Sequence, residues 1–526
     1  MQNELLTLKE ASELMSVQFN REVTTSNISY LVNYGRIQKY ADNGNTLVSK
    51  DELIKYYNSY YGDRQLRWKE KLGKDIDWHL SFEQFKEAET TKHVHRLHPY
   101  KGKFIPQLVE YFLDDHTDEF KKEVYFKKGD IILDPFCGSG TTLVQANELG
   151  MDALGIDISS FNSLISNVKI GHPDLDDLKL VLKKISSDLS RFLNESKTVQ
   201  FEQKLLEELS NFNNEYFPSP DFKIKVRDKK IDENKYGKEK EEQFLKTFNR
   251  LVGEYGVELK QENPTNFIDK WYLIHTRNEI DFVFELIKKI KNKETKKIAT
   301  IILSRTIRSC RATTHSDLAT LIDPISTTYY CSKHRKICKP LFSIQSWWER
   351  YSKDTVGRLQ EFNELRTDTF QHCFTGDGRD FNIIEESEKL NPEFGKKLKT
   401  KKINGIFSSP PYVGLIDYHD QHAYAYDLFG FKRRDEMEIG PLKKGQSKDA
   451  KNAYIDGIVS VLNNCKKYLV DDYNIFLVAN DKYDMYPTIA DMAGMKIVQQ
   501  FKRPVLNRTE KDKGAYSESI FHLKTK

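Results

Sequence analysis

The stretch from residue 130 to residue 150 constrains the fold of this chain more than any other part of its sequence. It opens with a short apolar run, IIL at 131–133, which is typical of a strand buried on both faces of a parallel sheet. A glycine-containing turn and a helix-like stretch follow, and a second strand pattern, ALGIDIS, occupies 153–159. This order predicts a β-α-β unit and therefore an α/β domain.

Further strand patterns lie far downstream, at 405–407 (GIF) and 474–479 (NIFLVA). The final segment, 495–526, has two strand patterns that predict an antiparallel hairpin closing the sheet. Between the two halves, residues 176–370 carry apolar residues at helical spacing and predict a large, mostly helical insertion. Within it, the Lys/Glu-rich stretch 221–242 lacks an apolar period and favours a loop.

The N-terminal segment, residues 1–60, reads as a small separate unit. TLKE from Thr7 and SKDE from Ser49 fit the capping box that starts a helix. An amphipathic stretch, a turn at 43–45 and an extended TLVS lie between them. This order resembles the winged helix-turn-helix modules of excisionases and related DNA-binding regulators, and the alternative is a dimerisation or packing domain. Residues 61–97 then favour a helical connector.

The strongest candidate for a ligand site is DPFCGSGTT, where the buried strand ends and the helix begins. Gly138 and Gly140 lack side chains, so backbone N–H groups and the helix N-terminus can approach a ligand. Asp157 follows the next strand, 17 residues after Gly140, where its carboxylate can accept hydrogen bonds from two ribose hydroxyls. The glycine patterns of dinucleotide and ATP sites do not fit, because no further glycine or lysine follows in register.

A second candidate is SSPPY, which follows the strand pattern at 405–407. Two prolines in series fix the backbone and leave two carbonyl groups as outward acceptors. An exposed Tyr412 beside them can stack on a planar base while the acceptors bind its exocyclic amine. A rigid turn without a binding role is the alternative for this segment taken alone.

Five segments together carry a family resemblance: HPYKGKF at 98–104, DPFCGSGTT at 134–142, GIDIS at 155–159, GDGRDF at 376–381 and SSPPY at 408–412. In this order they resemble the S-adenosylmethionine-dependent DNA amino-methyltransferases, which methylate cytosine N4 or adenine N6. The insertion between GIDIS and GDGRDF departs from the pattern, because it is longer and placed earlier than in simple members.

The resemblance implies a Rossmann-like methyltransferase sheet that binds S-adenosyl-L-methionine. The glycine turn would hold the methionine moiety, Asp157 the ribose, Asp377 the adenine amine, and Phe104 would close over the cofactor. The cofactor-binding residues so implied are Phe104, Asp134, Phe136, Gly138, Gly140, Thr141, Asp157 and Asp377. The catalytic residues so implied are Ser409, Pro410, Pro411 and Tyr412, which would hold a target base flipped out of the duplex.

The chemistry of an exocyclic amine accounts for this set of residues. Its lone pair is delocalised into the ring, and hydrogen bonds to the Ser409 side chain and the Pro410 carbonyl would favour a tetrahedral, nucleophilic nitrogen. Methylation at cytosine C5 would instead need a thiolate, typically in a Pro-Cys dipeptide, and the sequence has none. Cys137 is then a packing residue. Serine in place of the aspartate of DPPY favours cytosine N4, and adenine N6 stays open.

Charge indicates where DNA would bind. The whole chain is only +4, but residues 277–358 hold 17 Lys and Arg against 8 Asp and Glu, a net of +9. The alternative for the lysine-rich part, 288–297, is a solvated helix face. The DNA-binding candidates are Arg305, Arg308, Arg311, Lys333, Arg335 and Lys336, interleaved with aromatic residues.

Cysteine usage points to reduced thiols, because six cysteines are sparse in 526 residues. Cys331, His334 and Cys338 with Cys310 upstream could form a Cys3His zinc site, but the spacing is not a standard one, and we predict no metal. No run of about 18 apolar residues occurs and the N-terminus lacks a secretion-signal pattern. We therefore expect a cytoplasmic protein without a membrane span.

The sequence thus predicts five parts: a winged helix-turn-helix-like unit (1–60), a connector (61–97), the cofactor half (98–175), the insertion with candidate target recognition (176–370), and the catalytic half (371–526). The expected activity is site-specific methylation of double-stranded DNA, most simply at cytosine N4, in a restriction-modification system with a cognate endonuclease. The alternatives are adenine-N6 methylation, a non-catalytic DNA-binding regulator on the same scaffold, and methylation of RNA or a protein amide. The intact motifs argue against a decayed site.

Overall fold

The computed structural model of the chain describes the residues from Glu4 to Lys526 with short gaps. The described ranges are 4–19, 23–33, 36–42, 45–59, 70–73, 75–82, 84–85, 87–194, 197–260, 264–315, 317, 321–505 and 516–526. The predicted turn at 43–45 and the start of the predicted connector, 61–69, lie largely outside them.

A seven-stranded sheet forms the centre of the molecule, with the strand order β11-β12-β10-β9-β4-β5-β8. The five strands from β10 to β8 run parallel, whereas β11 and β12 pair antiparallel with each other and β12 pairs antiparallel with β10. The strands are β4 (Ile131–Asp134), β5 (Asp152–Asp157), β8 (Gln371–Thr375), β9 (Ile403–Ser408), β10 (Leu469–Ala479), β11 (Met495–Val505) and β12 (Tyr516–Thr525). The predicted α/β class and the closing hairpin are confirmed.

Helices cover both faces of this sheet because alternate side chains of each strand point to opposite sides. One apolar core holds Ile132 and Phe407 with residues of α6 (Pro106–Leu113), α7 (Thr141–Glu148) and α8 (Ser160–Ile170). The other core holds Leu133 and Ile406 from the same strands. It packs against α17 (Ile383–Leu390), α18 (Pro392–Lys401), α21 (Lys448–Lys466) and α22 (Tyr486–Met492).

The insertion leaves the sheet after α8 and returns at the edge strand β8. Its elements are α9 (Leu175–Asn194), α10 (Lys197–Tyr216), α11 (Asp221–Arg227), α12 (Glu233–Tyr255), α13 (Phe267–Trp271), α14 (Ile274–Lys288), α15 (Lys293–Ser309), the strands β6 (Tyr329–Cys331) and β7 (Lys336–Cys338), and α16 (Gln345–Asn363). The mostly helical character predicted for it agrees with these elements.

The prediction of a loop at 221–242 is wrong. The stretch forms α11 and the first part of α12, because Phe222 and Phe244 are buried in a core of their own with Phe201 and Phe248. The aromatic residues that anchor these helices are spaced too widely to stand out among the surrounding lysines and glutamates. Burial of such large rings offsets the weak apolar period of the segment.

The N-terminal unit has the order β1 (Leu5–Thr7), α1 (Leu8–Gln18), α2 (Thr25–Asn33), β2 (Tyr40–Asp42), β3 (Asn45–Ser49) and α3 (Lys50–Tyr57), with an antiparallel sheet β1-β3-β2. The Thr7–Glu10 capping box is present. Ser49 also caps its helix, but the Glu52 carboxylate accepts the Gln38 N–H at 2.7 Å, so the second box is incomplete.

Among the described residues between this unit and His98, short helical segments form. They include Trp78–Ser81, α5 (Glu87–Thr90) and His93–Arg96. In the part of the chain that the structure describes, no helix is both long and apolar enough to cross a membrane.

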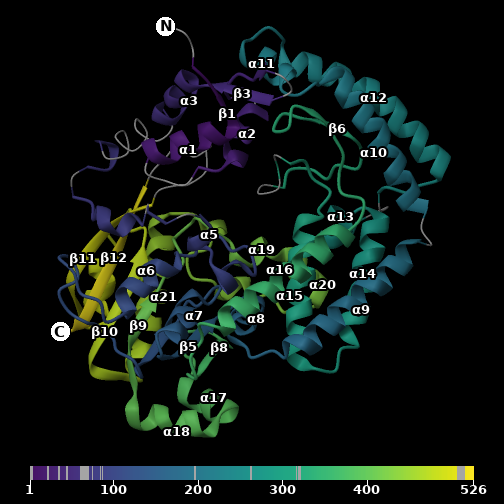
Figure 1. Cartoon of the computed structure of the whole chain (residues 1–526). Helices are drawn as coiled ribbons and strands as arrows, with labels where there is room; N and C mark the ends of the chain where they lie inside the picture. The colour runs from purple at the N-terminus through teal and green to yellow at the C-terminus, as the bar shows by residue number, and fades with distance from the viewer. Residues whose placement is uncertain are drawn as a thin grey trace.

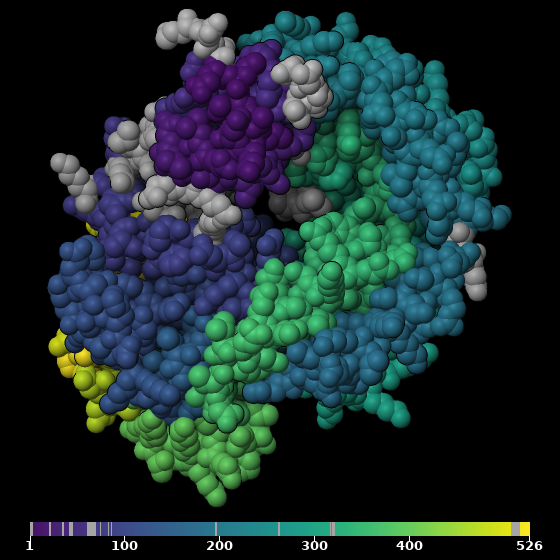
Figure 2. Space-filling model, viewed as in Figure 1, coloured from purple at the N-terminus to yellow at the C-terminus, as the bar shows by residue number. Residues whose placement is uncertain are grey.

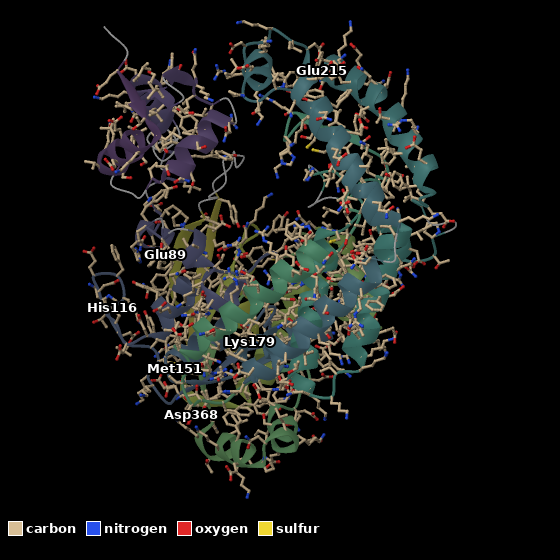
Figure 3. All side chains as sticks on the ribbon, turned by 45° about the vertical axis from the view of Figure 1, so that its right-hand side comes forward. Glu89, His116, Met151, Lys179, Glu215 and Asp368 are labelled. Carbon is tan, nitrogen blue, oxygen red and sulfur yellow. The ribbon has the colours of Figure 1, made fainter. Side chains whose placement is uncertain are left out.

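The insertion arches away from the sheet and meets the N-terminal unit at its far end (Figure 1). In Figure 3, Lys179 on α9 lies beside the sheet domain, and Glu215 on α10 lies at the opposite end of the insertion. There the Asn33 carbonyl accepts hydrogen bonds from Lys223 Nζ at 2.8 Å and from Ser219 Oγ at 3.1 Å. Figure 2 shows the intervening face hollowed between the N-terminal unit, the insertion and the sheet domain.

Candidate active site

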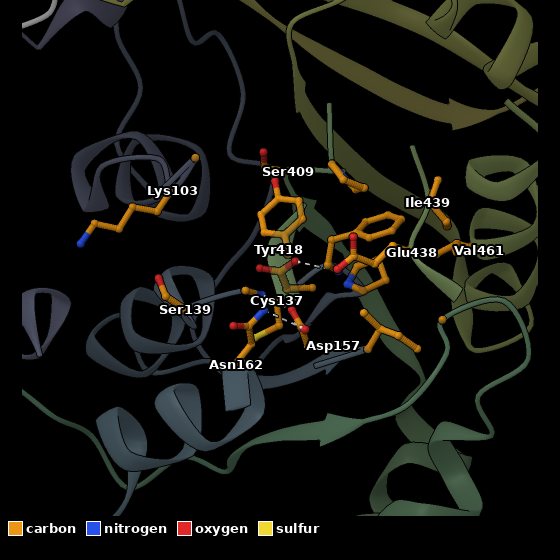
Figure 4. A pocket seen from close by; sticks show the side chains of 18 of the residues that line it. Lys103, Cys137, Ser139, Asp157, Asn162, Ser409, Tyr418, Glu438, Ile439 and Val461 are labelled. Carbon is orange, nitrogen blue, oxygen red and sulfur yellow. Dashed lines mark hydrogen bonds between the residues drawn. The ribbon is translucent and has the colours of Figure 1, made fainter. Parts of the chain in front are cut away.

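A pocket opens at the carboxyl ends of the parallel strands, where the loops after β4, β5, β8 and β9 converge (Figure 4). Its empty volume, counted out to its mouth, is about 880 Å³. Ligands of α/β sheets bind at this end of the strands, in the crevice where the strand order reverses. The strand order reverses between β4 and β9. These two strands pair in space, although the insertion and β8 separate them in sequence.

Most residues predicted from the sequence meet in this one pocket. Those that line it are Phe104, Asp134, Phe136, Gly138, Thr141, Asp157, Asp377, Ser409 and Pro411. Gly140, Pro410 and Tyr412 are not among the residues that line the pocket. Gly140 has a φ of +74° and turns the chain into α7, and an added Cβ would lie 3.1 Å from the Ser166 Cα. Pro410 is buried and Tyr412 is half-buried.

The Asp157 carboxylate fixes the glycine turn against the end of β5. One of its oxygens accepts the Gly138 N–H at 2.7 Å, and the other accepts the Ser159 N–H at 2.8 Å and the Asn162 side chain at 3.1 Å. Burial raises the pKa of Asp157 to about 6, although these hydrogen bonds oppose the shift. The oxygen that accepts the Gly138 N–H keeps a second lone pair, so the group can still accept a hydrogen bond from a ligand.

Asp134 ends β4 on the neighbouring side of the pocket. Its carboxylate accepts hydrogen bonds from the Ser408 hydroxyl and from the Phe136 N–H, and burial raises its pKa to about 6. The first serine of SSPPY therefore joins the two halves of the sheet across β4 and β9. The second serine, Ser409, faces the pocket instead (Figure 4).

Asp377 reaches the pocket from the loop after β8. Its carboxylate is held by Arg379, whose Nε donates at 2.9 Å. Burial opposes ionisation, but the hydrogen bonds from Arg379 outweigh it and lower the pKa of Asp377. This aspartate is therefore an ionised acceptor at neutral pH, oriented by a neighbouring guanidinium.

Several pocket residues were not predicted from the sequence. Tyr100 and Lys103 lie within HPYKGKF, and Tyr418 follows SSPPY closely, so their motifs could have indicated them. Met437, Glu438 and Ile439 come from a segment without any recognisable motif. Glu438 is buried, and its carboxylate accepts hydrogen bonds from the backbone N–H and the ring of His419.

The two histidines after SSPPY, His419 and His422, have packing roles. His419 is fully buried against Glu438, and His422 stacks among Tyr100, His98 and Phe161. Burial lowers the pKa of His422 to about 3, so this ring stays neutral. Neither histidine lines the pocket.

The Tyr412 side chain is hydrogen-bonded to the C-terminal hairpin. Its hydroxyl donates to Glu518 Oε1 at 2.8 Å, and Arg503 of the neighbouring strand pairs with the other oxygen of that carboxylate at 3.1 Å. All three side chains are mostly shielded from solvent. The hairpin thus sets the position of the tyrosine that ends the SSPPY turn.

The predicted phosphate contacts of Arg305 and Arg311 are not supported. Arg305 is 6% exposed and its guanidinium bonds Asp354 at 2.8 Å and Thr355 at 3.1 Å. Arg311 is 8% exposed and donates to the Arg308 carbonyl at 2.9 Å. Arg305 thus joins α15 to α16, Arg311 bonds the end of α15, and Arg308 beside them is half-buried.

The second basic group lies on the β6–β7 hairpin, away from the first. Arg335 is engaged within the insertion, because it donates to the Lys223 carbonyl at 3.0 Å and lies 3.5 Å from a Glu233 oxygen. Lys333 and Lys336 are exposed. Of the six predicted basic residues, these two have the most accessible charges. Of the aromatic residues near these basic residues, Tyr329 and Trp348 are buried and so are no platform for bases.

Comparisons with known proteins agree with the motifs. A family model described as DNA methylase, N6_N4_Mtase, matches residues 17–167. The chain is 46% identical over 529 residues to the Type II methyltransferase M.MjaII of Methanocaldococcus jannaschii, covering 99% of this chain and 97% of that protein.

Shorter similarities involve two further Type II methyltransferases. The Type II methyltransferase M.MvaI of Kocuria varians is 34% identical over 110 residues, which is 21% of this chain and 23% of that protein. The Type II methyltransferase M.BsoBI of Geobacillus stearothermophilus is 34% identical over 101 residues, 19% and 18% of the two chains. Among solved structures, the rRNA methyltransferase aviRa from Streptomyces viridochromogenes aligns with 84% of this chain and 94% of its own at 9% identity and a TM-score of 0.28, too low to bear on fold or function.

The pKa of Asp157 leads to a prediction about ligand affinity. The carboxyl takes up a proton as the pH falls through about 6, and a protonated acid is a weaker acceptor. The affinity for the expected cofactor, S-adenosyl-L-methionine, should therefore decline below about pH 6. Asp157→Asn should weaken binding roughly 10- to 150-fold at neutral pH, the loss of one hydrogen bond to a charged group, and flatten the decline. Isothermal titration calorimetry from pH 5 to pH 8 measures both effects.

Asp134→Asn is the matched control, because Asp134 lies in the same pocket with a similar pKa. A pH profile that Asp134→Asn flattens and Asp157→Asn leaves intact would refute the assignment of the ribose to Asp157.

Proposed function

Because this chain belongs to the family of DNA methyltransferases that modify exocyclic amino groups, we propose that it methylates cytosine N4 in double-stranded DNA, with S-adenosyl-L-methionine as the methyl donor. One observation carries the proposal: the glycine turn, Asp157, Asp377 and Ser409 come from four separate loops and line a single pocket. The family accounts for methyl transfer to DNA. The choice of cytosine and the roles of the residues are the proposal.

The pocket has buried polar atoms without a hydrogen-bond partner, which a bound cofactor could satisfy. Ser139 Oγ and Asn162 Oδ1 are buried in its lining and have no hydrogen-bond partner among the described residues. Such orphaned atoms are costly unless a ligand or water completes them. Asp157 would hold the ribose hydroxyls, Asp377 the adenine amine and Phe104 would cover the bound molecule. The cofactor supplies a methyl group on a positively charged sulfur.

Ser409 is placed to act on the target amine. Its side chain faces the same pocket as the glycine turn, the preceding Ser408 bonds Asp134 at the end of β4, and the two following prolines restrict the backbone of the turn. The Ser409 oxygen and the Pro410 carbonyl would accept the two amine hydrogens and so favour a tetrahedral nitrogen. No covalent intermediate with the protein is needed, and none of the described cysteines other than the buried Cys137 lines the pocket.

Serine at the start of the PPY turn supports cytosine N4. A serine hydroxyl is a neutral acceptor, in contrast to the aspartate of DPPY. Adenine N6 is the second candidate, since adenine-N6 members with serine exist. The same pocket would then hold adenine, which is a larger base than cytosine.

The remaining parts of the chain supply surfaces for duplex DNA. We propose that residues 1–60 form a winged helix-turn-helix unit that contacts DNA, with residues 61–97 as its connector. The β6–β7 hairpin of the insertion would contact phosphates through Lys333 and Lys336. The cofactor half (98–175) and the catalytic half (371–526) then face the duplex across the hollow of Figure 2.

The relatives' names support a place in a restriction-modification system, because all three are called Type II methyltransferases. We propose that this chain likewise protects a short recognition sequence from a cognate endonuclease. Its partner in the cell would then be an enzyme that reads the same sequence in unmethylated DNA.

Sequencing DNA from cells that express the protein tests the proposed activity. A chemistry that separates N4-methylcytosine from N6-methyladenine should find N4-methylcytosine in one short sequence context, and none in cells that express Ser409→Ala at the same level. N6-methyladenine in its place would select the second candidate. Unmodified DNA from cells with folded, cofactor-binding protein would favour the non-catalytic regulator or methylation of RNA or protein.

The division of labour within the SSPPY turn gives a second prediction. Tyr412→Ala should lose about 1–3 kcal/mol of base stacking, while Ser409→Ala should lower the rate constant more than it weakens DNA binding. A mismatch at the target base lowers the cost of flipping, so it should partly rescue Tyr412→Ala and do little for Ser409→Ala. Single-turnover methylation of matched and mismatched duplexes measures these differences.

Tyr412→Phe is the control, because it keeps the ring and removes only the hydroxyl, which bonds Glu518 and also interacts with the Ser409 side chain; Arg503 still pairs Glu518. It should stay close to wild type. Wild-type activity of Tyr412→Ala on matched duplex would instead mean that SSPPY is only a rigid turn.

The exposed lysines of the hairpin give a third prediction. Replacing Lys333 and Lys336 by Ala should weaken DNA binding at low salt and reduce the slope of log affinity against log salt by about 0.9 for each lost phosphate contact. Cofactor affinity should not change. Arg305→Met is the contrasting variant, since its buried guanidinium supports the fold, and it should lower the unfolding temperature without a specific change in the salt slope. A salt slope unchanged in the double lysine variant would mean that the hairpin does not touch the DNA backbone.

A further inference from the structure

Four side chains with metal-binding chemistry meet in the insertion, at a distance from the proposed active site in the fold. Cys331 ends β6, Cys338 ends β7, His334 lies in the turn between them, and His315 comes from the segment before the hairpin. One ligand atom from each lies within 4.8 Å of the others. Cys310, which the sequence analysis grouped with this hairpin, is buried at the end of α15 and does not belong to the cluster.

The separations between these atoms are those of a tetrahedral zinc site. The Cys331 sulfur lies 3.6 Å from His334 Nδ1 and 3.9 Å from His315 Nδ1, and the Cys338 sulfur lies 3.7 Å from His334 Nδ1. Bonds of about 2.3 Å to sulfur and about 2.0 Å to nitrogen, at tetrahedral angles, place the two ligand atoms roughly 3.6 Å apart. The sulfur–nitrogen distances are thus close to the edges of a zinc tetrahedron.

On the side of the four ligand residues the hairpin has little apolar core, whereas Tyr330 and Ile337 on its other side pack on the helices of the insertion. Each of its strands has three residues, and its local apolar cluster consists of Tyr329, Cys331 and Cys338 with Ile325 beside them. An isolated two-stranded hairpin is marginal in water, and small units with little core usually hold a metal or a disulfide. Weak S–H···N hydrogen bonds, the alternative for this cluster, would contribute little.

We propose that His315, Cys331, His334 and Cys338 bind a structural Zn²⁺ ion. Two thiolates and two imidazoles at tetrahedral spacing suit zinc, whereas magnesium and calcium require oxygen ligands. Four protein ligands leave no open position, so the ion holds structure and takes no part in methyl transfer. This proposal departs from the prediction from sequence that the chain binds no metal.

The groups around the cluster are compatible with the ion. The Tyr329 hydroxyl lies 2.8 Å from His315 Nδ1 and also accepts the backbone N–H of His315 at 3.1 Å. It therefore keeps a partner when the ring nitrogen binds metal. His315 and His334 are half-buried, which leaves an entry path for the ion, while the two sulfurs are shielded.

The ion would lock the hairpin onto the long helices of the insertion. Ile337 of β7 exchanges two hydrogen bonds with the Asn213 side chain of α10, at 2.9 and 3.0 Å. Tyr330 of β6 packs directly over Gly237 of α12, where a Cβ would come within 2.6 Å of the ring, and its N–H donates to Glu241 at 2.9 Å. On the proposed function, a metal-fixed turn also holds Lys333 and Lys336 toward the DNA.

Metal analysis of the full-length protein tests the proposal. Protein purified without added metal and passed over a chelating resin should contain about one zinc per chain by mass spectrometry. Cys331→Ser and His334→Gln should each lose most of it. Cys310→Ala should keep it, which separates this cluster from the Cys3His set considered from the sequence.

Cobalt substitution gives an independent readout that does not require a folded variant. Wild-type protein exchanged with Co²⁺ should show the absorption of tetrahedral cobalt with thiolate charge transfer, because two ligands are cysteines. A zinc content far below one per chain, or a cobalt complex without thiolate absorption, would overturn the proposal. Neither measurement involves DNA or methyl transfer, so failure of the proposed function would leave the result unaffected.

Discussion

The pocket depends above all on one buried carboxylate, that of Asp157. It closes the end of β5 against the glycine turn after β4, through the N–H of Gly138 on one oxygen and the N–H of Ser159 on the other. Without this acceptor two backbone donors would be buried and unpaired, which costs about 1–3 kcal/mol for each. The same burial raises the pKa of the carboxyl to about 6, so the group that shapes the site takes up a proton in mildly acidic solution.

The two halves of the site are joined by polar contacts between strands that lie far apart in the sequence. Ser408 at the end of β9 bonds Asp134 at the end of β4, and Tyr412 in the following turn bonds Glu518 in the last strand. The first contact sets the SSPPY turn relative to the glycine turn. The second sets the tyrosine relative to the hairpin. The base-binding and cofactor-binding groups are therefore positioned by the same sheet.

The sequence alone predicted those features that depend on residues close together in the chain. The β-α-β unit, the glycine turn, Asp157 and SSPPY could be found because apolar runs and spacing are local. Glu438 and Glu518 could not, because only the folding of distant segments brings them to the pocket and to Tyr412. His315 was missed for a similar reason, since it lies outside the compact Cys-x2-His-x3-Cys stretch. Arg305 was misassigned because charge in a sequence does not reveal a buried partner such as Asp354.

The position of the insertion has a consequence for how the chain folds. The edge strand β8 pairs with β5 although their residues are separated by about 200 positions, as in the contact between Phe370 and Asp152, 218 apart. Closing so long a loop costs roughly 2 kcal/mol more entropy than an ordinary crossover of about 15 residues. The first and last helices of the insertion, α9 and α16, pack together, with Trp348 donating to Ser186 and Gln345 to Ser190. Their pairing brings the two ends together and shortens the effective loop, so completion of the edge strand, and of the loop that carries Asp377, is coupled to the folding of the insertion.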